Sequence, residues 1–166
     1  MSGAPAWVSY AALALSAGSL AVSGLAYRAG GPRLRLRAAL VPRDAASNPF
    51  SGGCAVRLTV VNAGRAAVTV EKFGVTPYGE RKAAVTIGDG SGPALPHRLE
   101  AHASETWLVD ALPPAREYDA LIRSGRLKPH SSWPSQFNFS VAAGNGKSAR
   151  DRRNFDSLRL IADSKP

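Results

Sequence analysis

Short runs of apolar residues alternate with polar ones along most of the chain behind residue 32, and this period of two predicts half-buried β-strands. Turn residues such as Asn62-Ala63-Gly64 separate the runs at intervals of about 8–12 residues, a spacing typical of antiparallel sandwiches. The apolar positions that define the expected strands are Leu34, Leu36 and Ala38; Val56, Leu58 and Val60; Val68 and Val70; Phe73 and Val75; Ala83 to Ile87; Leu95 to Leu99; Thr106 to Val109; Phe137, Phe139 and Val141; and Leu158, Leu160 and Ala162.

Three further features of the sequence refine this pattern. Between Val70 and Phe73 the apolar phase shifts by one residue, which predicts a β-bulge near Glu71–Lys72. Gly144-Asn145-Gly146 follows an alternating run and predicts a hairpin turn. Pro93 and Pro96 restrict the run Leu95 to Leu99 to a short edge strand.

One helix is expected among the strands, over about residues 114–124. Pro113 and Pro114 suit a first helical turn. Tyr118, Leu121 and Ile122 stand at helical spacing, and Gly125 suits the position just after the helix, where a left-handed backbone is common. We expect this helix to cap the sandwich.

The first 27 residues contain no charged side chain. From residue 7 to residue 27 the chain is long enough to span the hydrocarbon core of a bilayer, about 30 Å, as a helix. Ser and Gly dilute its Leu and Val, so the segment is only weakly apolar. We predict an N-terminal membrane anchor whose characteristic residues, including aromatic ones at both ends, are Trp7, Tyr10, Leu13, Leu20 and Tyr27.

A cleaved signal peptide is the main alternative, but it needs a basic start, which is absent here, and positive charges follow the apolar run at once. These charges predict a single-pass plasma-membrane protein with its C-terminal domain in the cytoplasm. Residues placed to contact anionic lipid are Arg28, Arg33, Arg35 and Arg37, with Arg43 further along.

Small residues recur along one side of the expected N-terminal helix, at spacings of four and three. They are Ala12, Ser16, Ser19, Ser23 and Ala26. Small residues let two helices approach closely, so a homodimer through this face is one interpretation. A helix that is merely rich in Ala and Ser is the other.

Two segments resemble parts of a known fold. VRLTVVNAGRAAVTVEKFGV (56–75) resembles the paired strands of immunoglobulin-like domains in bacterial surface and membrane proteins. LPHRLEAHASETWLVD (95–110) is similar to the later part of such domains, although the Cys…Trp…Cys pattern of antibody domains is absent. The resemblance implies an all-β, immunoglobulin-like β-sandwich of about seven strands with one short helix, preceded by a transmembrane helix. It implies no particular function.

The expected organisation is an anchor over residues 1–28, a linker over residues 29–32 and a β-sandwich domain over residues 33–166. The formal net charge of +9, from 21 Lys+Arg against 12 Asp+Glu, favours acidic partners such as anionic lipid, nucleic acid or an acidic protein. One basic run, together with the arginines at 33, 35 and 37, is a candidate phosphate-binding face. This run consists of Lys147, Arg150, Arg152 and Arg153.

None of the candidate patterns in the sequence meets the requirements of a catalytic or metal-binding motif. Gly144 to Ser148 ends like a phosphate-binding loop, but Val141 stands where the motif needs its first Gly. His97 and His102 are five residues apart rather than the four of a helical zinc motif, and His130 is remote. Asp89 in its Gly-rich loop lacks neighbouring oxygen ligands. Cys54, the single cysteine, is interpreted as a core residue.

The leading hypothesis is therefore a membrane-tethered, non-enzymatic protein-interaction module without a cofactor or metal. A small enzyme, either a hydrolase or a nucleotide-binding protein, whose site carries no recognisable motif is the second. A basic adaptor that binds nucleic acid or anionic lipid is the third. Nucleic acid is the less favoured ligand, because no aromatic residues are interleaved with the basic run.

Overall fold

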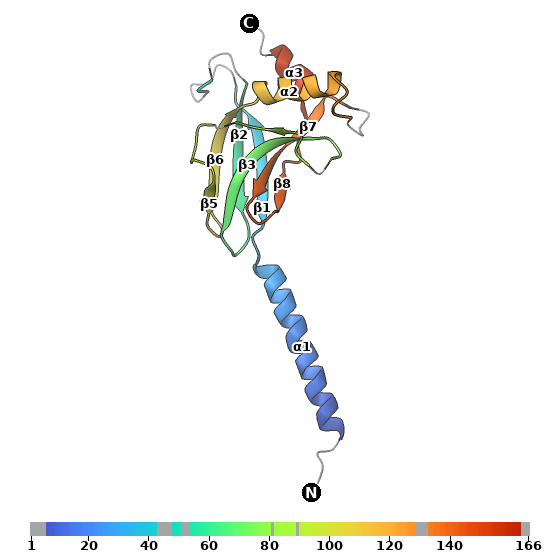
Figure 1. Cartoon of the computed structure of the whole chain (residues 1–166). Coiled ribbons are helices and arrows are strands. Elements are labelled where there is room, and N and C mark those ends of the chain that lie inside the picture. Colours follow the sequence, from blue (N-terminus) through green and yellow to red (C-terminus); the bar gives the residue numbers. More distant parts are fainter. Residues whose placement is uncertain are drawn as a thin grey trace.

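The structure, a computed structural model, describes residues 6–42, 48–50, 54–80, 82–88, 90–128 and 133–163. Three helices and two antiparallel sheets make up this part of the chain (Figure 1). Helix α1 (Ala6–Gly30) projects from one end of an elongated domain. Helices α2 (Leu112–Arg123) and α3 (Ser157–Asp163) lie together at the opposite end.

The smaller sheet has three strands in the order β1-β2-β6, and the larger has six strands built around the pair β3-β7. The strands of the smaller sheet are β1 (Leu34–Leu40), β2 (Ala55–Asn62) and β6 (Ser104–Asp110). Those of the larger sheet are β3 (Val68–Pro77), with β4 (Val85–Thr86) and β5 (His97–Leu99) on one side, and β7 (Gln136–Ala143), with β8 (Ser148–Arg150) and β9 (Phe155–Asp156) on the other.

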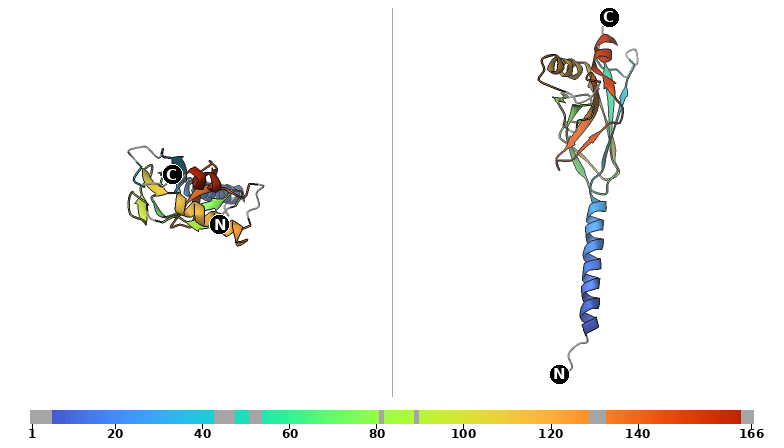
Figure 2. Two further views of the ribbon diagram at one scale, coloured as in Figure 1. Left: turned by 90° about the horizontal axis from the view of Figure 1, so that it is seen from above. Right: turned by 90° about the vertical axis from the view of Figure 1, so that its right-hand side faces the viewer.

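The hydrophobic core lies between the two sheets, which the turned view shows as two layers (Figure 2). Leu58 and Trp107, which are opposite each other in the smaller sheet, belong to one buried cluster with Phe73 and Phe139 of the larger sheet. The rings of Trp107 and Phe73 meet edge to face at 5.2 Å, an arrangement that aromatic pairs prefer. The Trp107 indole N–H donates to the carbonyl of Pro93 at 2.7 Å, so its one polar group is satisfied.

The prediction of an all-β, immunoglobulin-like sandwich of about seven strands behind a transmembrane helix is wrong. The described chain combines three helices with sheets of three and six strands and is a mixed α/β fold. The main reason lies at the C-terminus, where Leu158 and Leu160 belong to α3 and not to a last strand. Asp156 caps this helix, because its Oδ1 atom accepts hydrogen bonds from the Leu158 and Arg159 amides at 2.9 and 3.4 Å.

Several local predictions are confirmed. The ladder between β3 and β7 shifts register between Val70 and Lys72, where the bulge was expected. Gly125 follows α2 with φ +69°, the left-handed conformation that ends a helix without steric strain in glycine. The short edge strand is β5, and the turn that ends at Gly146 joins β7 to β8. The strand expected over 83–87 is reduced to β4.

The predicted membrane anchor is also wrong. Among the described residues, no helix combines the length and the apolarity needed to cross a bilayer. Ala, Ser and Gly fill most of α1, which leaves too few large apolar side chains. Of the expected anchor residues, Trp7, Tyr10, Leu13 and Leu20 are exposed on α1, whereas the side chain of Tyr27 lies outside the described part. The predicted single-pass location, and the cytoplasmic orientation derived from it, lose their basis.

Candidate functional site

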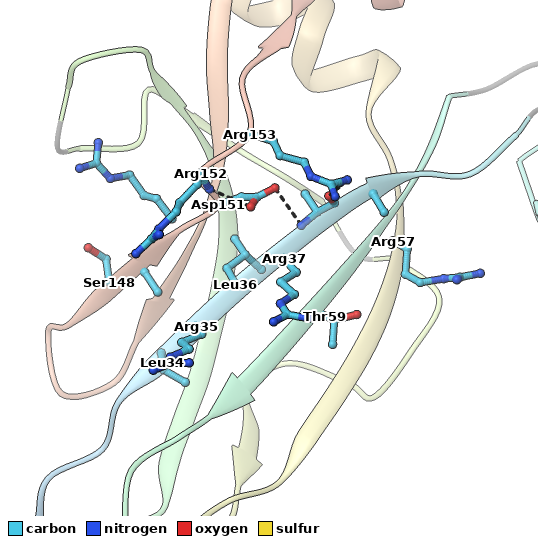
Figure 3. A pocket seen from close by; sticks show the side chains of 14 residues that line it. Leu34, Arg35, Leu36, Arg37, Arg57, Thr59, Ser148, Asp151, Arg152 and Arg153 are labelled. Atoms are coloured by element: carbon cyan, nitrogen blue, oxygen red, sulfur yellow. Dashed lines mark hydrogen bonds between the residues drawn. The ribbon is translucent and has the colours of Figure 1, made fainter.

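A groove of about 840 Å³ runs along the neighbouring edge strands of the two sheets, β1 of the smaller one and β8 of the larger one. Strand β1 borders it on one side, and β8 with the residues after it borders the other (Figure 3). Its charged lining consists of six arginines and one acid, which are Arg35, Arg37, Arg57, Arg150, Arg152, Arg153 and Asp151. We call it the arginine groove.

The arginines on the β1 side of the groove point outward because side chains alternate between the two faces of a strand. Leu36 and Ala38 point into the core and are 5% and 2% exposed, so the alternate residues Arg35 and Arg37 must point outward. Ala39 is opposite Arg57 in the antiparallel ladder with β2, which places the Arg57 side chain on the same outer face. Three arginines from two strands therefore share one surface.

The β8 side depends on the tight turn that reverses the chain after β7. Gly146 adopts φ +74° there, and the Lys147 amide donates to Asn145 Oδ1 at 3.1 Å. The returning strand presents Arg150 at the groove, but one guanidinium nitrogen of Arg150 donates to the carbonyl of Glu80. Arg150 is therefore partly engaged within the chain.

Asp151 is 8% exposed and joins the two sides of the groove (Figure 3). Its Oδ2 accepts a hydrogen bond from the Ala38 amide at 3.0 Å, and its Oδ1 accepts one from the Arg152 amide at 2.7 Å. Its own amide donates to the Phe139 carbonyl at 2.9 Å. Both carboxylate oxygens are occupied by backbone donors, so Asp151 links the two sheets structurally and is not placed as a general base.

Among the described residues, no ion pair joins an arginine of the groove to an acidic side chain. The ion pairs that the described residues form lie outside the groove. They join Arg98 to Glu100, Arg123 to Asp119, and Arg159 to Asp163. A guanidinium group presents a planar set of donors that matches a carboxylate or phosphate. The groove therefore offers several cationic donors to an anionic ligand.

The structure brings together the two basic segments singled out in the sequence. Arg35 and Arg37 share the groove with the basic run, whereas Arg33 and Lys147 line an adjoining hollow of about 350 Å³. That these residues bind phosphate stays a prediction. Because no described helix is long and apolar enough to cross a membrane, the reason for expecting Arg33, Arg35 and Arg37 to contact lipid is lost, and the side chain of Arg28 lies outside the described residues.

Sequence reasoning missed two contributors from β2, Arg57 and Thr59. The available signal was the polar position of Arg57 between Val56 and Leu58. It pointed to an exposed arginine, but only the pairing of β1 with β2 places it beside the groove.

The other candidate residues do not form a site among the described positions. His97 packs edge to face against Trp107 at 5.8 Å, and Glu100 pairs with Arg98. His102 lies in a turn with φ +61°. No group of three His, Cys, Asp or Glu side chains in the described ranges is placed to hold a metal ion. His130 and Asp89 lie outside those ranges.

Cys54 is half-buried and free, just before β2. Burial raises the pKa of its thiol, and the negative charges of Asp110 and Asp163 raise it further. A thiol with a raised pKa remains protonated near neutral pH and is a weak nucleophile. Cys54 packs against the hydrophobic core as a partly buried residue, whereas the sequence predicted a core residue.

Neither a protein-family model nor a curated protein matches this sequence. The geometry of the groove therefore carries the functional argument.

Proposed function

We propose that this chain is a non-enzymatic protein-interaction module whose arginine groove holds an acidic segment of a partner protein. The observation that carries the proposal is the cluster of six arginines around a single acid that is already hydrogen-bonded to the backbone. Each exposed ion pair is weak, so a ligand with several carboxylates in a row gains most from such a surface.

The composition of the groove favours binding over catalysis. Its lining contains no His, Cys or Tyr, and each oxygen of the Asp151 carboxylate already accepts a backbone hydrogen bond. A hydrolase needs a nucleophile or a general base with a free position toward the substrate. The described groove presents arginines, Thr59 and Ser148 without a base beside either hydroxyl.

The same composition favours an acidic protein over single-stranded nucleic acid. Proteins that bind single strands combine positive charge with aromatic side chains on which the bases stack. The lining of the arginine groove contains no aromatic residue. Besides the arginines and Asp151, the groove is lined by Leu34, Leu36, Ala38, Ala39, Thr59, Ser148 and Ala149.

The test measures the affinity of the full chain for a fluorescent oligoglutamate peptide, beside an oligoglutamine peptide and a single-stranded oligothymidine. We expect the glutamate peptide to bind, the glutamine peptide not to bind, and the affinity to fall with added salt because salt screens exposed charges. Binding of oligothymidine alone, or of none of the three, overturns the proposal.

A matched pair of double variants separates the groove from the overall charge. Arg37→Gln with Arg152→Gln removes two groove charges, and we expect about a tenfold loss of affinity for oligoglutamate. Arg116→Gln with Arg126→Gln removes two exposed charges near α2, outside the groove, and serves as the control. Equal losses in both variants show nonspecific attraction and contradict a site in the groove.

A further inference from the structure

Three arginines of the groove surround one small residue, Ala39. On the outer face of the smaller sheet, Arg37 and Ala39 are alternate residues of β1, and Arg57 of β2 is directly opposite Ala39. Arg153, which follows β8, lines the same part of the groove and also shares a second hollow with Ala39. The methyl group of Ala39 is much shorter than the arginine side chains around it. It therefore forms the floor of a recess, which we call the Ala39 depression.

Arg153 is held beside Ala39 by two buried side chains. Asn138, 7% exposed, donates from Nδ2 to the Arg153 carbonyl at 2.7 Å. Asp151, two residues earlier, accepts from the Ala38 amide at 3.0 Å and so fixes this segment against β1. One guanidinium nitrogen of Arg153 donates to the Ala38 carbonyl at 3.5 Å, and the side chain reaches over β1 (Figure 3). A guanidinium has five N–H groups, so this single long contact leaves donors for a ligand.

Thr59 adds a hydroxyl group next to the Ala39 depression. It is opposite Arg37 in the ladder between β1 and β2, and Figure 3 shows the two side chains next to each other. The Oγ1 atoms of Thr59 and Thr106 are 3.2 Å apart, and either can be the donor. When Thr106 donates to Thr59, the hydroxyl proton of Thr59 is available to an anion beside Arg37.

The Arg57 side chain extends away from Arg37 in Figure 3. It is exposed, and exposed side chains change rotamer within picoseconds to nanoseconds. Strand pairing fixes the backbone of Arg57 opposite Ala39, so a change of rotamer is enough to bring its guanidinium over the depression. Among the described residues, no ion pair engages Arg37, Arg57 or Arg153.

Three guanidinium groups and a hydroxyl around one small recess suit a phosphoryl group better than a carboxylate. A carboxylate has two oxygens and one negative charge, and a single guanidinium satisfies both oxygens in a bidentate pair. A phosphorylated side chain has three acceptor oxygens and a charge of about −1.5 to −2 at pH 7. It accepts hydrogen bonds from several arginines at once and offsets the repulsion among them.

We propose that the acidic partner segment carries a phosphorylated serine or threonine whose phosphoryl group binds in the Ala39 depression, between its three arginines. The inference rests on the proposed function and names the group that the partner inserts. Arg35 and Arg152 lie elsewhere along the groove, where they contact acidic residues that flank the phosphorylated one. Phosphorylation of the partner therefore strengthens its binding to this chain.

The first test measures the affinity of the full chain for three short peptides that differ only at a central position between flanking glutamates. One peptide has phosphoserine there, the second has serine, and the third has two glutamates, which match the charge of the phosphoserine. We expect the phosphopeptide to bind about tenfold more tightly than the serine peptide and several-fold more tightly than the charge-matched peptide.

The comparison separates the two proposals. A phosphopeptide that binds no more tightly than the charge-matched peptide overturns the phosphoryl site but leaves the acidic-partner function standing. Failure of all three peptides to bind overturns both.

Two pairs of charge-preserving substitutions locate the phosphoryl group within the groove. Arg37→Lys with Arg57→Lys keeps both positive charges but removes the forked donors at the depression, and should reduce the preference for phosphoserine over two glutamates to about twofold or less. Arg35→Lys with Arg152→Lys makes the same change elsewhere in the groove and should leave that preference intact. Equal losses in the two pairs contradict the placement.

Filling the depression provides a test that leaves every charge in place. Ala39→Leu puts a longer side chain between the arginines and should lower the affinity for the phosphopeptide about tenfold, with little effect on the serine peptide. Ser104→Leu adds the same side chain to the exposed face of β6, outside the groove lining, and is the control. Urea unfolding checks that both variants fold. An unchanged phosphopeptide affinity in folded Ala39→Leu overturns the site.

A lipid headgroup also carries a phosphoryl group, so the full chain is mixed with phosphatidylcholine vesicles that contain phosphatidic acid. We expect no sedimentation of the chain with these vesicles under the conditions in which the phosphopeptide binds. Binding to the vesicles without binding to the phosphopeptide overturns the assignment of the phosphoryl group to a protein partner.

Discussion

The Asp151 carboxylate accepts a hydrogen bond from the Ala38 amide at 3.0 Å, across 113 positions of sequence. It thereby ties the edge strand of one sheet to the segment that follows the edge strand of the other. A buried carboxylate that accepts backbone hydrogen bonds makes stronger contacts than a neutral acceptor does. This link sets where the arginine groove closes.

Replacing Asp151 should therefore destabilise the domain. We expect Asp151→Ala to lower the free energy of unfolding by about 2–4 kcal/mol, because it leaves the Ala38 amide without its acceptor. Asp151→Asn, which keeps one acceptor oxygen, should lose less. Urea unfolding measures both, with Asp163→Ala, which removes an exposed helical ion pair with Arg159, as a control expected to cost about 0.5 kcal/mol. A loss for Asp151→Ala no larger than that of the control contradicts the link.

Tyr118 should make stability fall at high pH. Its side chain is fully buried, and burial raises the pKa of its hydroxyl to about 12. The hydroxyl also donates toward the carbonyls of Pro134 and Gln136, at 3.0 Å each. The folded state holds this proton more tightly than the unfolded state. The stabilisation that the protonated Tyr118 provides is therefore complete below pH 10 and is lost as pH rises toward 12.

The rise of the Tyr118 pKa from 10 to about 12 corresponds to a contribution of roughly 2.7 kcal/mol to the free energy of unfolding. The measurement is the free energy of unfolding between pH 9 and pH 12 for the natural chain and for Tyr118→Phe. The difference between the two curves isolates Tyr118 from the lysines and the other tyrosines. The variant should start about 1 kcal/mol lower and fall less steeply. Parallel curves would show that Tyr118 does not titrate as expected.

Cys54 should react slowly with alkylating reagents. Burial and then the charges of Asp110 and Asp163 raise the pKa of this thiol, so its thiolate fraction near pH 8 is small. We expect iodoacetamide to modify Cys54 of the folded chain several-fold more slowly than the urea-unfolded chain. Asp110→Asn should speed the reaction by removing one charge, while its amide oxygen can still accept from the Leu112 amide. If Cys54 of the folded chain reacts as fast as Cys54 of the unfolded chain, the prediction of a protected thiol is wrong.

Removal of residues 1–30 should leave the thermal unfolding of the β domain unchanged within about 2 °C. No side chain of α1 that the structure describes belongs to the hydrophobic core, and its large apolar side chains are mostly exposed, as with Leu15 at 76%. Calorimetry of the full and shortened chains provides the comparison. Leu58→Ala, which removes a fully buried side chain, serves as the positive control, with an expected cost of about 2–5 kcal/mol. A large shift on removing α1 would mean that it packs on the domain.

Much of the local structure could be read from the residues because it depends on neighbours along the chain. The alternation of Leu34 with Arg35 identifies both the strand and its exposed face. The phase shift after Val70 locates the bulge, and Gly125 marks the end of α2. Local patterns were less informative where they were short. Leu158 and Leu160 fit either a strand or one helical turn, and the capping by Asp156 produces the helix.

By itself, the sequence determined which positions are apolar, which faces of the strands carry arginine, and the excess of positive charge. Tertiary structure decided what those features form together. The groove exists because β1 and β8, more than a hundred residues apart, come to lie at facing edges of two sheets. Their juxtaposition depends on strand pairing and core packing between distant segments, and no pattern of neighbouring residues encodes it.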